Sequence, residues 1–398
     1  MQESVALYVH IPFCMAKCDY CDFFSLPCAG KDIPDGYVAS LLSEAEWRAR
    51  LYSEKNALKG WKTIYVGGGT PSLLSPSQLE FLLDGLKRLL PEKEPLEITV
   101  EMNPESLSLE HLKAMTRSGV GRLSLGIQSL NEKALKNVSR HCRAKDCLEA
   151  LELVKSEWRG DLNLDVIAGL GGASQDEFEE SLGKILEWEP EHISLYTLTV
   201  EEETPLAKRI EAGERWSQEE ADSQWLKGRD ILKEKGYLQY EVSNFARPGH
   251  ESVHNMTYWK QEDYIGIGSG ASGSLYDFTE KGGYRWTNTR NLDLYSSFWT
   301  GDKISLDEMP EEREELPLEV EEFEYIMMGL RTSGGINSQE YKRRFSRLKW
   351  KGDLSERLGE EGGLWNDWQK RKMAERRGED YFLTEKGLLF LNSFLTSL

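Results

Sequence analysis

The stretch Tyr8-Val-His-Ile-Pro-Phe-Cys14-Met-Ala-Lys-Cys18-Asp-Tyr-Cys21-Asp-Phe-Phe24 sets three cysteines into one short loop directly after an apolar, strand-like run. In a reducing cell, cysteines at this density are metal ligands more often than disulfide partners, and three cannot all pair among themselves. A cluster with four irons takes one ligand per iron, so three thiolates leave one iron open to a small molecule. The spacing therefore predicts an iron–sulfur centre held by Cys14, Cys18 and Cys21.

A structural zinc site is the alternative for the same loop, with His10 or Cys28 as the fourth ligand. Zinc sites usually contain pairs of cysteines separated by two residues, whereas this loop has only one such gap. Outside the loop, Cys142 and Cys147 are expected to be buried packing residues, because free cysteines behave as small apolar side chains.

The composition indicates a water-soluble globular protein. The chain has 398 residues, 39% of them apolar, which is enough for one large domain and a smaller one. Its formal charge of −19 argues against a phosphate backbone as partner, so no nucleic acid is expected. No apolar run approaches the ~18–20 residues of a membrane span, and no signal-peptide pattern is present. We expect a cytoplasmic protein, with peripheral membrane association left open.

Strand-like and helix-like segments alternate through the first half of the chain. Short apolar runs begin near residues 7, 63, 98, 123, 162 and 193, and helical periodicity lies between them, as in Asp35 to Tyr52 and Ser75 to Leu90. Such alternation predicts a parallel sheet of the α/β class. Right-handed crossovers would curl it into a partial (βα)6 barrel, whose site lies at the carboxyl ends of the strands.

Polar or glycine-rich groups follow each apolar run, as this barrel requires. In chain order they are the cysteine loop, Gly67-Gly68-Gly69-Thr70-Pro71-Ser72, Glu101-Met-Asn103-Pro104-Glu105, Gly126-Ile-Gln128-Ser129, Asp165 with Gly169, and Tyr196 with Glu201 to Pro205. Each group alone suits a turn, a helix cap or a solvated charge. Their coincidence on one predicted rim favours a binding site, with the glycine run leaving backbone amide and carbonyl groups free for a charged ligand.

The cysteine spacing, with Tyr20 before the third cysteine, resembles the signature of the radical S-adenosylmethionine (SAM) superfamily. The preceding Tyr-Val-His-Ile-Pro-Phe-Cys resembles its oxygen-independent coproporphyrinogen oxidase branch. The resemblance implies a [4Fe-4S] cluster whose fourth iron chelates the amino and carboxylate groups of SAM. It also implies a SAM pocket formed by Tyr8, Gly67, Gly68, Gly69, Thr70, Glu101, Gln128, Arg140 and Asp165. Arg140 suits the carboxylate, and Asp165 and Gln128 suit the ribose hydroxyls.

A second motif lies beyond the barrel, in Arg247-Pro-Gly-His250-Glu-Ser-Val-His254-Asn255-Met-Thr-Tyr258-Trp259. On chemistry alone, an aromatic-packed loop with solvated histidines is the simpler interpretation. However, His-Asn-x-x-Tyr-Trp resembles a motif of the HemW group, the heme-chaperone members of this branch. The resemblance implies heme contacts from His254, His250, Asn255, Tyr258 and Trp259. Gly266-Ile-Gly268-Ser-Gly270 is not expected to bind a dinucleotide, since no helical pattern follows it.

Three segments are predicted: the barrel with the cluster and SAM site (1–205), a barrel extension with the histidine motif (206–309) and a C-terminal domain (310–398). In the last segment we expect a helix opening in the Glu-rich Glu311 to Glu324, a second near Ser338 to Phe345, and a hairpin-like edge from Tyr381 to Thr384 before a final apolar helix. This arrangement resembles the small winged-helix-type domain of the branch. Its basic stretch near Lys342 is expected to be a solvated face or a partner surface.

Departures from the family patterns favour the chaperone group over the oxidases. The oxidases read Cys-x-Cys at the end of the signature and carry a long N-terminal arm, whereas this chain reads Cys21-Asp22-Phe23 and has seven residues before Tyr8. HemW members usually read Gly-Leu-Pro-Gly at 169–172 and histidine at Ser272, which this chain lacks. We expect a protein that binds a [4Fe-4S] cluster, SAM and heme and delivers heme to recipient hemoproteins. The alternatives are coproporphyrinogen III dehydrogenase and, less favoured, a zinc-stapled binding module.

Overall fold

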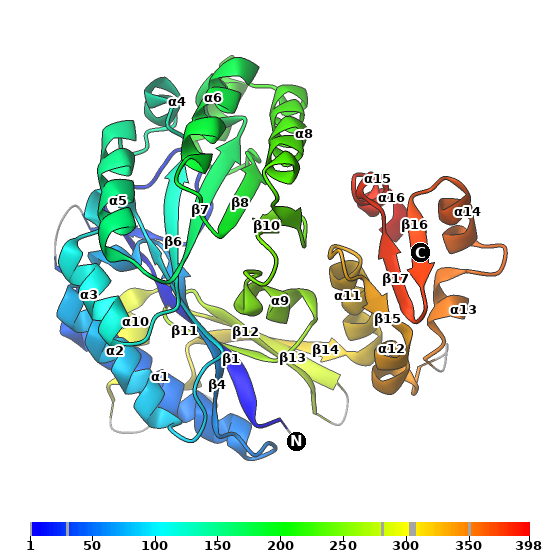
Figure 1. Ribbon diagram of the computed structural model, residues 1–398. Helices are drawn as coiled ribbons and strands as arrows, with labels where there is room; N and C mark the ends of the chain where they lie inside the picture. The colour runs from blue at the N-terminus through cyan, green and yellow to red at the C-terminus, as the bar shows by residue number, and fades with distance from the viewer. Residues whose placement is uncertain (1, 29–31, 280–281, 302–307, 349–351) are drawn as a thin grey trace.

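A computed structural model describes residues 2–28, 32–279, 282–301, 308–348 and 352–398. Six parallel strands form its centre and are joined by helices, as Figure 1 shows. The strands are β1 (Ser4–Ile11), β4 (Gly60–Gly68), β5 (Glu97–Met102), β6 (Arg122–Gln128), β7 (Asp161–Ala168) and β8 (His192–Thr197). The helices between them are α1 (Asp35–Ser53), α2 (Pro76–Leu89), α3 (Leu109–Arg117), α4 (Glu132–Asn137), α5 (Ala144–Glu157) and α6 (Gln175–Leu186). The predicted partial (βα)6 barrel is thus confirmed.

Local sequence explains these elements. In β1 the side chains of Leu7 and Val9 are fully buried, and parallel pairing sets Leu7 beside Ile64 of β4. Helix α2 begins where predicted, because the Ser75 hydroxyl accepts a hydrogen bond from the Gln78 amide and the Ser75 amide donates one to Gln78 Oε1. Cys142 and Cys147 are buried in the core, as expected, with 3.5 Å between their sulfurs.

The residues that follow β8 widen the sheet at both edges, and the described strands do not close it. Among the described residues the order is β14-β13-β12-β11-β1-β4-β5-β6-β7-β8-β10-β9. The added elements are α7 (Pro205–Glu211), α8 (Gln218–Glu234), β9 (Leu238–Gln239), β10 (Asn244–Ala246), α9 (Val253–Trp259), β11 (Tyr264–Ile267), β12 (Ser272–Thr279), β13 (Gly282–Asn288), α10 (Leu292–Trp299) and β14 (Glu311–Pro317). The Gly266 to Gly270 turn joins β11 to β12 directly, without the helix that a dinucleotide site needs.

A buried ion pair fixes α1 to these added strands. Arg48 Nη2 lies 3.0 Å from Glu44 Oε1 and 2.5 Å from Glu311 Oε2, and all three side chains are almost fully buried. Glu44 Oε2 accepts hydrogen bonds from the Tyr295 hydroxyl at 2.6 Å and the Gly268 amide at 2.9 Å. Burial raises the pKa of Glu44, and the charge of Arg48 opposes this shift. The network ties α1, α10, β14 and the β11–β12 turn together.

The C-terminal part has a core of its own. Its elements are α11 (Leu318–Gly329), β15 (Ile336–Asn337), α12 (Ser338–Phe345), α13 (Leu354–Leu358), α14 (Leu364–Lys370), β16 (Ala374–Arg377), β17 (Asp380–Leu383), α15 (Glu385–Leu388) and α16 (Leu391–Leu395). Trp365 and Phe394 are fully buried within it. The strands β16 and β17 form the expected hairpin beside β15, which agrees with a winged-helix-type arrangement.

The prediction of a helix from Glu311 is wrong for its first seven residues. Glu311–Pro317 is strand β14, which pairs antiparallel with β13 at the edge of the main sheet, and the helix begins at Leu318. Four successive exposed residues, from Glu312 to Glu315, suit an edge strand because charged side chains discourage pairing with another chain. The main sheet therefore extends past the predicted boundary at residue 310.

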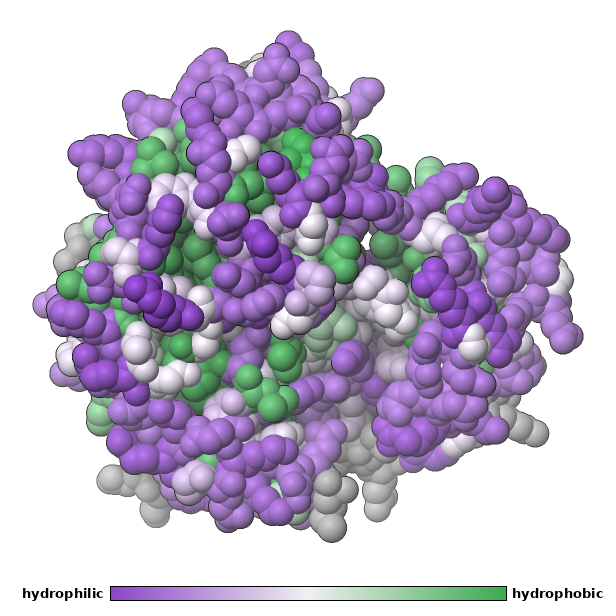
Figure 2. Space-filling view, viewed as in Figure 1, coloured by the Kyte–Doolittle hydropathy of each residue, from purple (hydrophilic) through white to green (hydrophobic). Residues whose placement is uncertain are grey.

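The visible surface is mainly hydrophilic (Figure 2). On the face shown in Figure 2, hydrophilic residues cover most of the molecule and apolar ones show mainly in recesses. Among the described residues, no helix combines the length and the apolar character that crossing a membrane requires.

Candidate functional site

Several of the residues predicted for the cluster and SAM meet at the carboxyl ends of the central strands, whereas the two candidate heme histidines lie elsewhere. The Thr70 hydroxyl, which follows β4, lies 3.5 Å from the Cys14 sulfur. Arg140 Nη1 lies 3.9 Å from the Cys18 sulfur, and its Nη2 donates to the Gly126 carbonyl at the end of β6. These contacts join the cysteine loop to residues from distant parts of the sequence, because parallel strands bring their following loops to one edge.

The cysteine loop is held by backbone hydrogen bonds. The short strand β2 (Phe13–Cys14) pairs with β3 (Leu26–Pro27), and the Cys28 amide donates to the Cys14 carbonyl at 2.8 Å. The Cys21 amide donates to the Cys18 carbonyl at 3.1 Å. Burial raises the pKa of the Cys18 and Cys21 thiols, and the Arg140 guanidinium opposes the shift at Cys18. The loop thus presents three partly exposed thiols beside one partly buried cation.

This donor set fits an iron–sulfur cluster. Thiolates are the ligands that such clusters use, and Arg140 supplies positive charge next to one of them. Among the described residues, no three His, Cys, Asp or Glu side chains gather closely enough to hold a single metal ion. His10, a fourth ligand in the zinc alternative, uses both ring nitrogens elsewhere: Nδ1 lies 2.9 Å from the Tyr8 hydroxyl and Nε2 lies 3.0 Å from the Phe24 carbonyl.

Two buried polar atoms near the cysteines have no hydrogen-bond partner among the residues that the structure describes. They are Arg140 Nε and Glu105 Oε2. A buried polar group without a partner is costly, so these two atoms fit contacts to a polar ligand. Arg140 Nε fits the carboxylate of an amino acid group, as expected for SAM. Glu105 was missed in the sequence analysis as a separate site residue, although it lies in the polar segment after β5.

The glycine run does not leave all its amides free, contrary to expectation. The Gly68 amide donates to Glu101 Oε2 at 2.9 Å, and the Gly69 amide donates to the Ile11 carbonyl at 2.9 Å. A Cβ atom on Gly67 would lie 2.7 Å from the Glu101 carboxyl, and one on Gly68 would lie 2.2 Å from the His10 ring. Gly68 also has φ of +108°. The glycines are thus required by close packing of neighbouring side chains.

Glu101 occupies the centre of the predicted pocket. Its Oε1 accepts a 2.6 Å hydrogen bond from the Tyr65 hydroxyl. Burial raises the pKa of Glu101 to about 7, and the nearby charge of Asp165 adds to the shift, whereas the Tyr65 and Gly68 hydrogen bonds oppose it. Tyr65 was missed from the sequence. Tyr65 lies two residues from both Thr63 and Gly67 in β4, so the two-residue period of a strand puts all three on the same face. This pattern could have identified Tyr65 as an inner residue.

Asp165 and Gln128 lie near each other on adjacent strands. Asp165 Oδ1 accepts from Asn163 Nδ2 at 2.8 Å, and Oδ2 accepts from the Ser124 hydroxyl at 3.4 Å. Burial raises the pKa of Asp165. Gln128 has a φ of +65°, which is unusual for a residue other than glycine, and the β6–β7 register shifts between Gly126 and Gln128. Such backbone strain is concentrated at functional sites.

The two candidate heme histidines lie in different environments. His254, on α9, is buried, with Nδ1 2.7 Å from the Thr63 hydroxyl and Nε2 2.7 Å from the Tyr258 hydroxyl. Its ring stacks on Tyr65 at 4.8 Å, and burial lowers its pKa to about 3. Iron ligation by His254 requires one of these bonds to break. His250 has a side chain 39% exposed, with Nδ1 2.9 Å from Asp161 Oδ1.

Comparisons with known proteins show the family to which the chain belongs. A profile of the Radical SAM superfamily matches residues 8–185. The heme chaperone HemW of Lactococcus lactis is 33% identical over 94% of this chain and 95% of its own, and that of Escherichia coli is 37% identical over 72% and 74%. The structure of coproporphyrinogen III oxidase (HemN) from Escherichia coli, a radical SAM enzyme, covers all of this chain and 90% of its own with a TM-score of 0.79 at 20% identity. The chain therefore belongs to the HemW family of the radical SAM superfamily.

Proposed function

We propose that this protein is a heme chaperone that binds a [4Fe-4S] cluster, SAM and heme, and delivers heme to hemoproteins in the cytoplasm. The observation that carries the proposal is similarity along almost the whole chain to a relative named as a heme chaperone, 33% identical over 380 residues. The likeness to coproporphyrinogen III oxidase extends over the whole chain at 20% identity, which supports a shared fold. The chaperone is therefore the better-supported function.

In this proposal Cys14, Cys18 and Cys21 hold the cluster, which when bound supplies an electron and an open iron for SAM. Arg140 is well placed to bind the SAM carboxylate, because its unpartnered Nε lies beside the cysteine loop. Burial strengthens such charge-assisted contacts by excluding water. Asp165 and Gln128 are proposed to accept and donate hydrogen bonds at the ribose.

Glu101 is proposed to accept a hydrogen bond from the SAM amino group, with Tyr8 and the Gly67 to Thr70 segment around it. The Tyr65 hydroxyl and the Gly68 amide each hold one carboxylate oxygen in place. A carboxylate oxygen carries more than one acceptor site, so each remains able to accept from a ligand. The charge on Glu101 then affects how strongly the amino group is held, because a carboxylate is a stronger hydrogen-bond acceptor than a neutral carboxyl group.

SAM affinity is expected to fall as pH decreases from 8 to 6. The pKa of Glu101 is raised to about 7, so the carboxyl is charged above that pH and neutral below it. Loss of the charge should weaken binding up to about tenfold at one unit below the pKa. Calorimetric titration with SAM at each pH measures this. Two histidines also lie near this site, since His10 contacts Tyr8 and His254 stacks on Tyr65. Burial lowers the pKa of both imidazoles, which favours their neutral forms, so the expected pH dependence is assigned to Glu101.

Glu101→Gln separates this contribution from that of Asp165, whose pKa is also raised by burial. The variant should bind SAM more weakly at pH 8 and show a flatter pH profile. Glu46→Gln, at an exposed position on α1, is the control and should keep the native profile. A Glu101→Gln protein with the native pH dependence would remove Glu101 from the proposed role.

The function is tested with anaerobically reconstituted protein in two parallel assays. Titration with hemin, followed by mixing with a heme-free hemoprotein, should show binding and then transfer of the heme absorption. Incubation with coproporphyrinogen III, SAM and a reductant should yield no protoporphyrinogen. Failure to bind hemin, or appreciable protoporphyrinogen production, would contradict the chaperone function.

A further inference from the structure

Helix α9, which carries the histidine motif, is fixed to the main sheet at its first turn. Glu97, the first residue of β5, accepts hydrogen bonds from the Val253 amide at 3.2 Å and the His254 amide at 3.0 Å. The hydroxyl of Ser252, which caps the helix, donates to the same carboxylate at 3.0 Å. Glu97 also forms a buried ion pair with Arg122 on the adjacent strand β6. A carboxylate at a helix N-terminus is stabilising, so α9 begins at a fixed position on the sheet.

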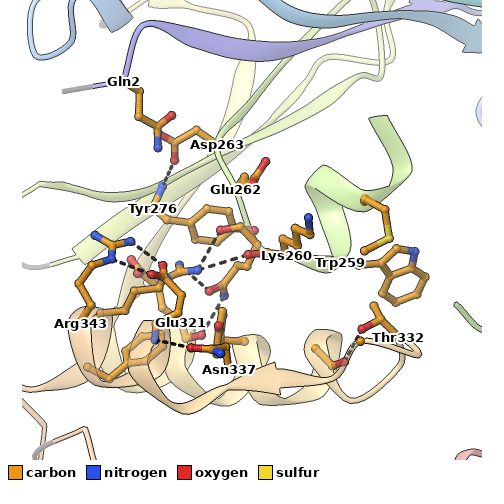
Figure 3. Close-up of a pocket in the computed structure, with 18 of the residues that line it drawn as sticks. Gln2, Trp259, Lys260, Glu262, Asp263, Tyr276, Glu321, Thr332, Asn337 and Arg343 are labelled. Carbon is orange, nitrogen blue, oxygen red and sulfur yellow. Dashed lines mark hydrogen bonds and ion pairs between the residues drawn. The ribbon is translucent and has the colours of Figure 1, made fainter. Parts of the chain in front are cut away.

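The outer face of α9 lines a cleft between the main sheet and the C-terminal helices, as Figure 3 shows. The cleft has a volume of about 1010 Å³, and Met256 and Trp259 belong to its wall. The Trp259 indole is hydrogen-bonded to Glu241, a buried residue. No histidine is among the described residues that line the cleft. The histidines of the motif therefore do not contribute to this surface.

The inner face of α9 carries His254 and Tyr258, which are four residues apart and thus on one side of the helix. The His254 residue is 1% exposed. Its Nδ1 lies 2.7 Å from the Thr63 hydroxyl, and its Nε2 lies 2.7 Å from the Tyr258 hydroxyl. Burial lowers the pKa of His254 to about 3, so the imidazole is neutral and has one donor and one acceptor nitrogen. Hydroxyl groups of the protein therefore occupy both ring nitrogens.

The imidazole of His254 also supports the ring of Tyr65. The two ring centres lie 4.8 Å apart, and their planes are 26° from parallel, which is a stacked arrangement. The hydrogen bonds to Thr63 of β4 and Tyr258 of α9 fix the orientation of the imidazole, because they hold its two nitrogens from different elements. At the far end of Tyr65, the hydroxyl donates to Glu101 Oε1 at 2.6 Å. His254 thus holds the ring whose hydroxyl contacts the carboxylate of the proposed SAM pocket.

We propose that His254 is a positioning residue of the SAM pocket that acts on Glu101 through Tyr65; this inference rests on the proposed SAM site. Its imidazole keeps Tyr65 in the orientation in which the Tyr65 hydroxyl reaches Glu101. That hydrogen bond favours the charged carboxylate, which accepts more strongly from the SAM amino group. Iron ligation would require one imidazole nitrogen to lose its hydroxyl partner, whereas positioning uses the contacts that are present. His254 is thereby assigned to the SAM pocket instead of to heme iron.

The charge of Glu101 gives this role a measurable signature. Burial raises the pKa of Glu101 to about 7, and the Tyr65 hydrogen bond opposes the rise. Loss of that hydrogen bond should raise the pKa further, so that the carboxyl becomes neutral, and SAM affinity falls, at a higher pH than in the native protein. The titratable groups that act on Glu101 are Tyr8 on β1, Tyr65 on β4, Asp165 on β7, Tyr196 on β8 and Tyr258 on α9.

These neighbours do not obscure the signature. Burial raises the pKa of each of the tyrosines, so they stay neutral over the range tested. Asp165 keeps its surroundings in every variant below, so differences between the variants report on Glu101.

Three variants, each reconstituted with its cluster, test this role by calorimetric titration with SAM between about pH 6 and 9. His254→Ala removes the ring, His254→Phe keeps a ring that can stack on Tyr65 but has no nitrogen, and Tyr65→Phe removes the hydroxyl. His254→Ala and Tyr65→Phe should each weaken SAM binding about tenfold at pH 8 and move the fall in affinity to higher pH, because a hydrogen bond to a charged group is weakened or lost. His254→Phe should bind SAM at least about threefold more tightly than His254→Ala, since ring stacking is kept.

The double variant shows whether His254 and Tyr65 act together. Adding His254→Ala to Tyr65→Phe should change SAM affinity less than about twofold, because the hydrogen bond that His254 supports is already absent. His111→Ala on α3 is the matched control, since His111 is also buried and both its ring nitrogens are hydrogen-bonded, to the Ser108 hydroxyl and the Leu74 carbonyl. It should keep the native SAM affinity and pH profile. Cluster absorption reports folding; where His254→Ala loses it, His254→Gln, which keeps hydrogen bonding but not the aromatic ring, takes its place.

Native SAM affinity and pH profile in His254→Ala would overturn the inference, and so would fully additive losses in the double variant. Each protein is also titrated with hemin: equal loss of hemin binding in His254→Ala and His254→Phe, with native SAM binding in both, would assign His254 to the iron instead. A native protein that binds no SAM would refute the proposed SAM site itself. One that binds SAM but no hemin would refute the chaperone function, and the SAM titrations would still decide the role of His254.

Discussion

Cys18→Ser is expected to abolish the cluster and with it tight SAM binding. A serine hydroxyl is a poor iron ligand compared with a thiolate, and three cysteines leave none to spare for a four-iron cluster. The purified variant should lose iron, acid-labile sulfide and the visible absorption of the cluster. Its SAM affinity should fall at least about tenfold, because the chelating iron is gone while Arg140 and Glu101 remain.

Cys28→Ser is the matched control for this experiment. Cys28 is partly exposed and close in space to Cys14, since its amide donates to the Cys14 carbonyl. Cys28 lies in the same loop region but is not one of the proposed cluster ligands. The variant should keep native iron, sulfide and SAM affinity. Loss of the cluster in Cys28→Ser, or its retention in Cys18→Ser, would contradict the assignment of the ligands.

Arg48→Met is expected to destabilise the fold by about 3–5 kcal/mol, because it leaves the buried carboxylates of Glu44 and Glu311 without their cation. Arg50→Met, two residues along the same helix, removes an exposed pair with Glu46 and should cost less than about 1 kcal/mol. Urea unfolding followed by tryptophan fluorescence compares the two, since Trp286 and Trp299 both lie within 6.0 Å of the Arg48 guanidinium. Equal changes in the two variants would refute a structural role for the network.

The barrel and the cysteine loop could be predicted because their signals are local. Apolar runs spaced by amphipathic helices determine the order of parallel strands, and the Cys14 to Cys21 spacing lies within one loop. The rim also follows from topology, since parallel strands bring their following segments together. Thus Thr70 and Arg140 are found beside the cysteines, as expected.

Contacts between distant segments could not be predicted in the same way. The Gly68 amide donates a hydrogen bond to Glu101, and His254 stacks on Tyr65. Both contacts depend on how inner side chains of different strands pack against each other. The strand β14 was mistaken for helix because its glutamate-rich sequence favours helix, whereas pairing with β13 decides the outcome. The cleft beside Trp259 arises only when the C-terminal helices pack near α9.

A series of contacts connects the histidine motif on α9 with the glycine run after β4. His254 stacks on Tyr65, and the Tyr65 hydroxyl binds Glu101, which in turn accepts from the Gly68 amide. Met256 and Trp259 of the same helix line the cleft. The helix α9 therefore contacts both the inner wall of the proposed SAM pocket and the cleft beside the C-terminal helices.

Electron paramagnetic resonance of the reduced, reconstituted protein, recorded with and without SAM, tests the cluster and its open iron most directly. We expect the signal of a reduced [4Fe-4S] cluster whose shape changes when SAM is added, because SAM binds the iron that no cysteine occupies. The absence of a four-iron signal, or a four-iron signal that saturating SAM leaves unchanged, would contradict a SAM-binding cluster in this protein.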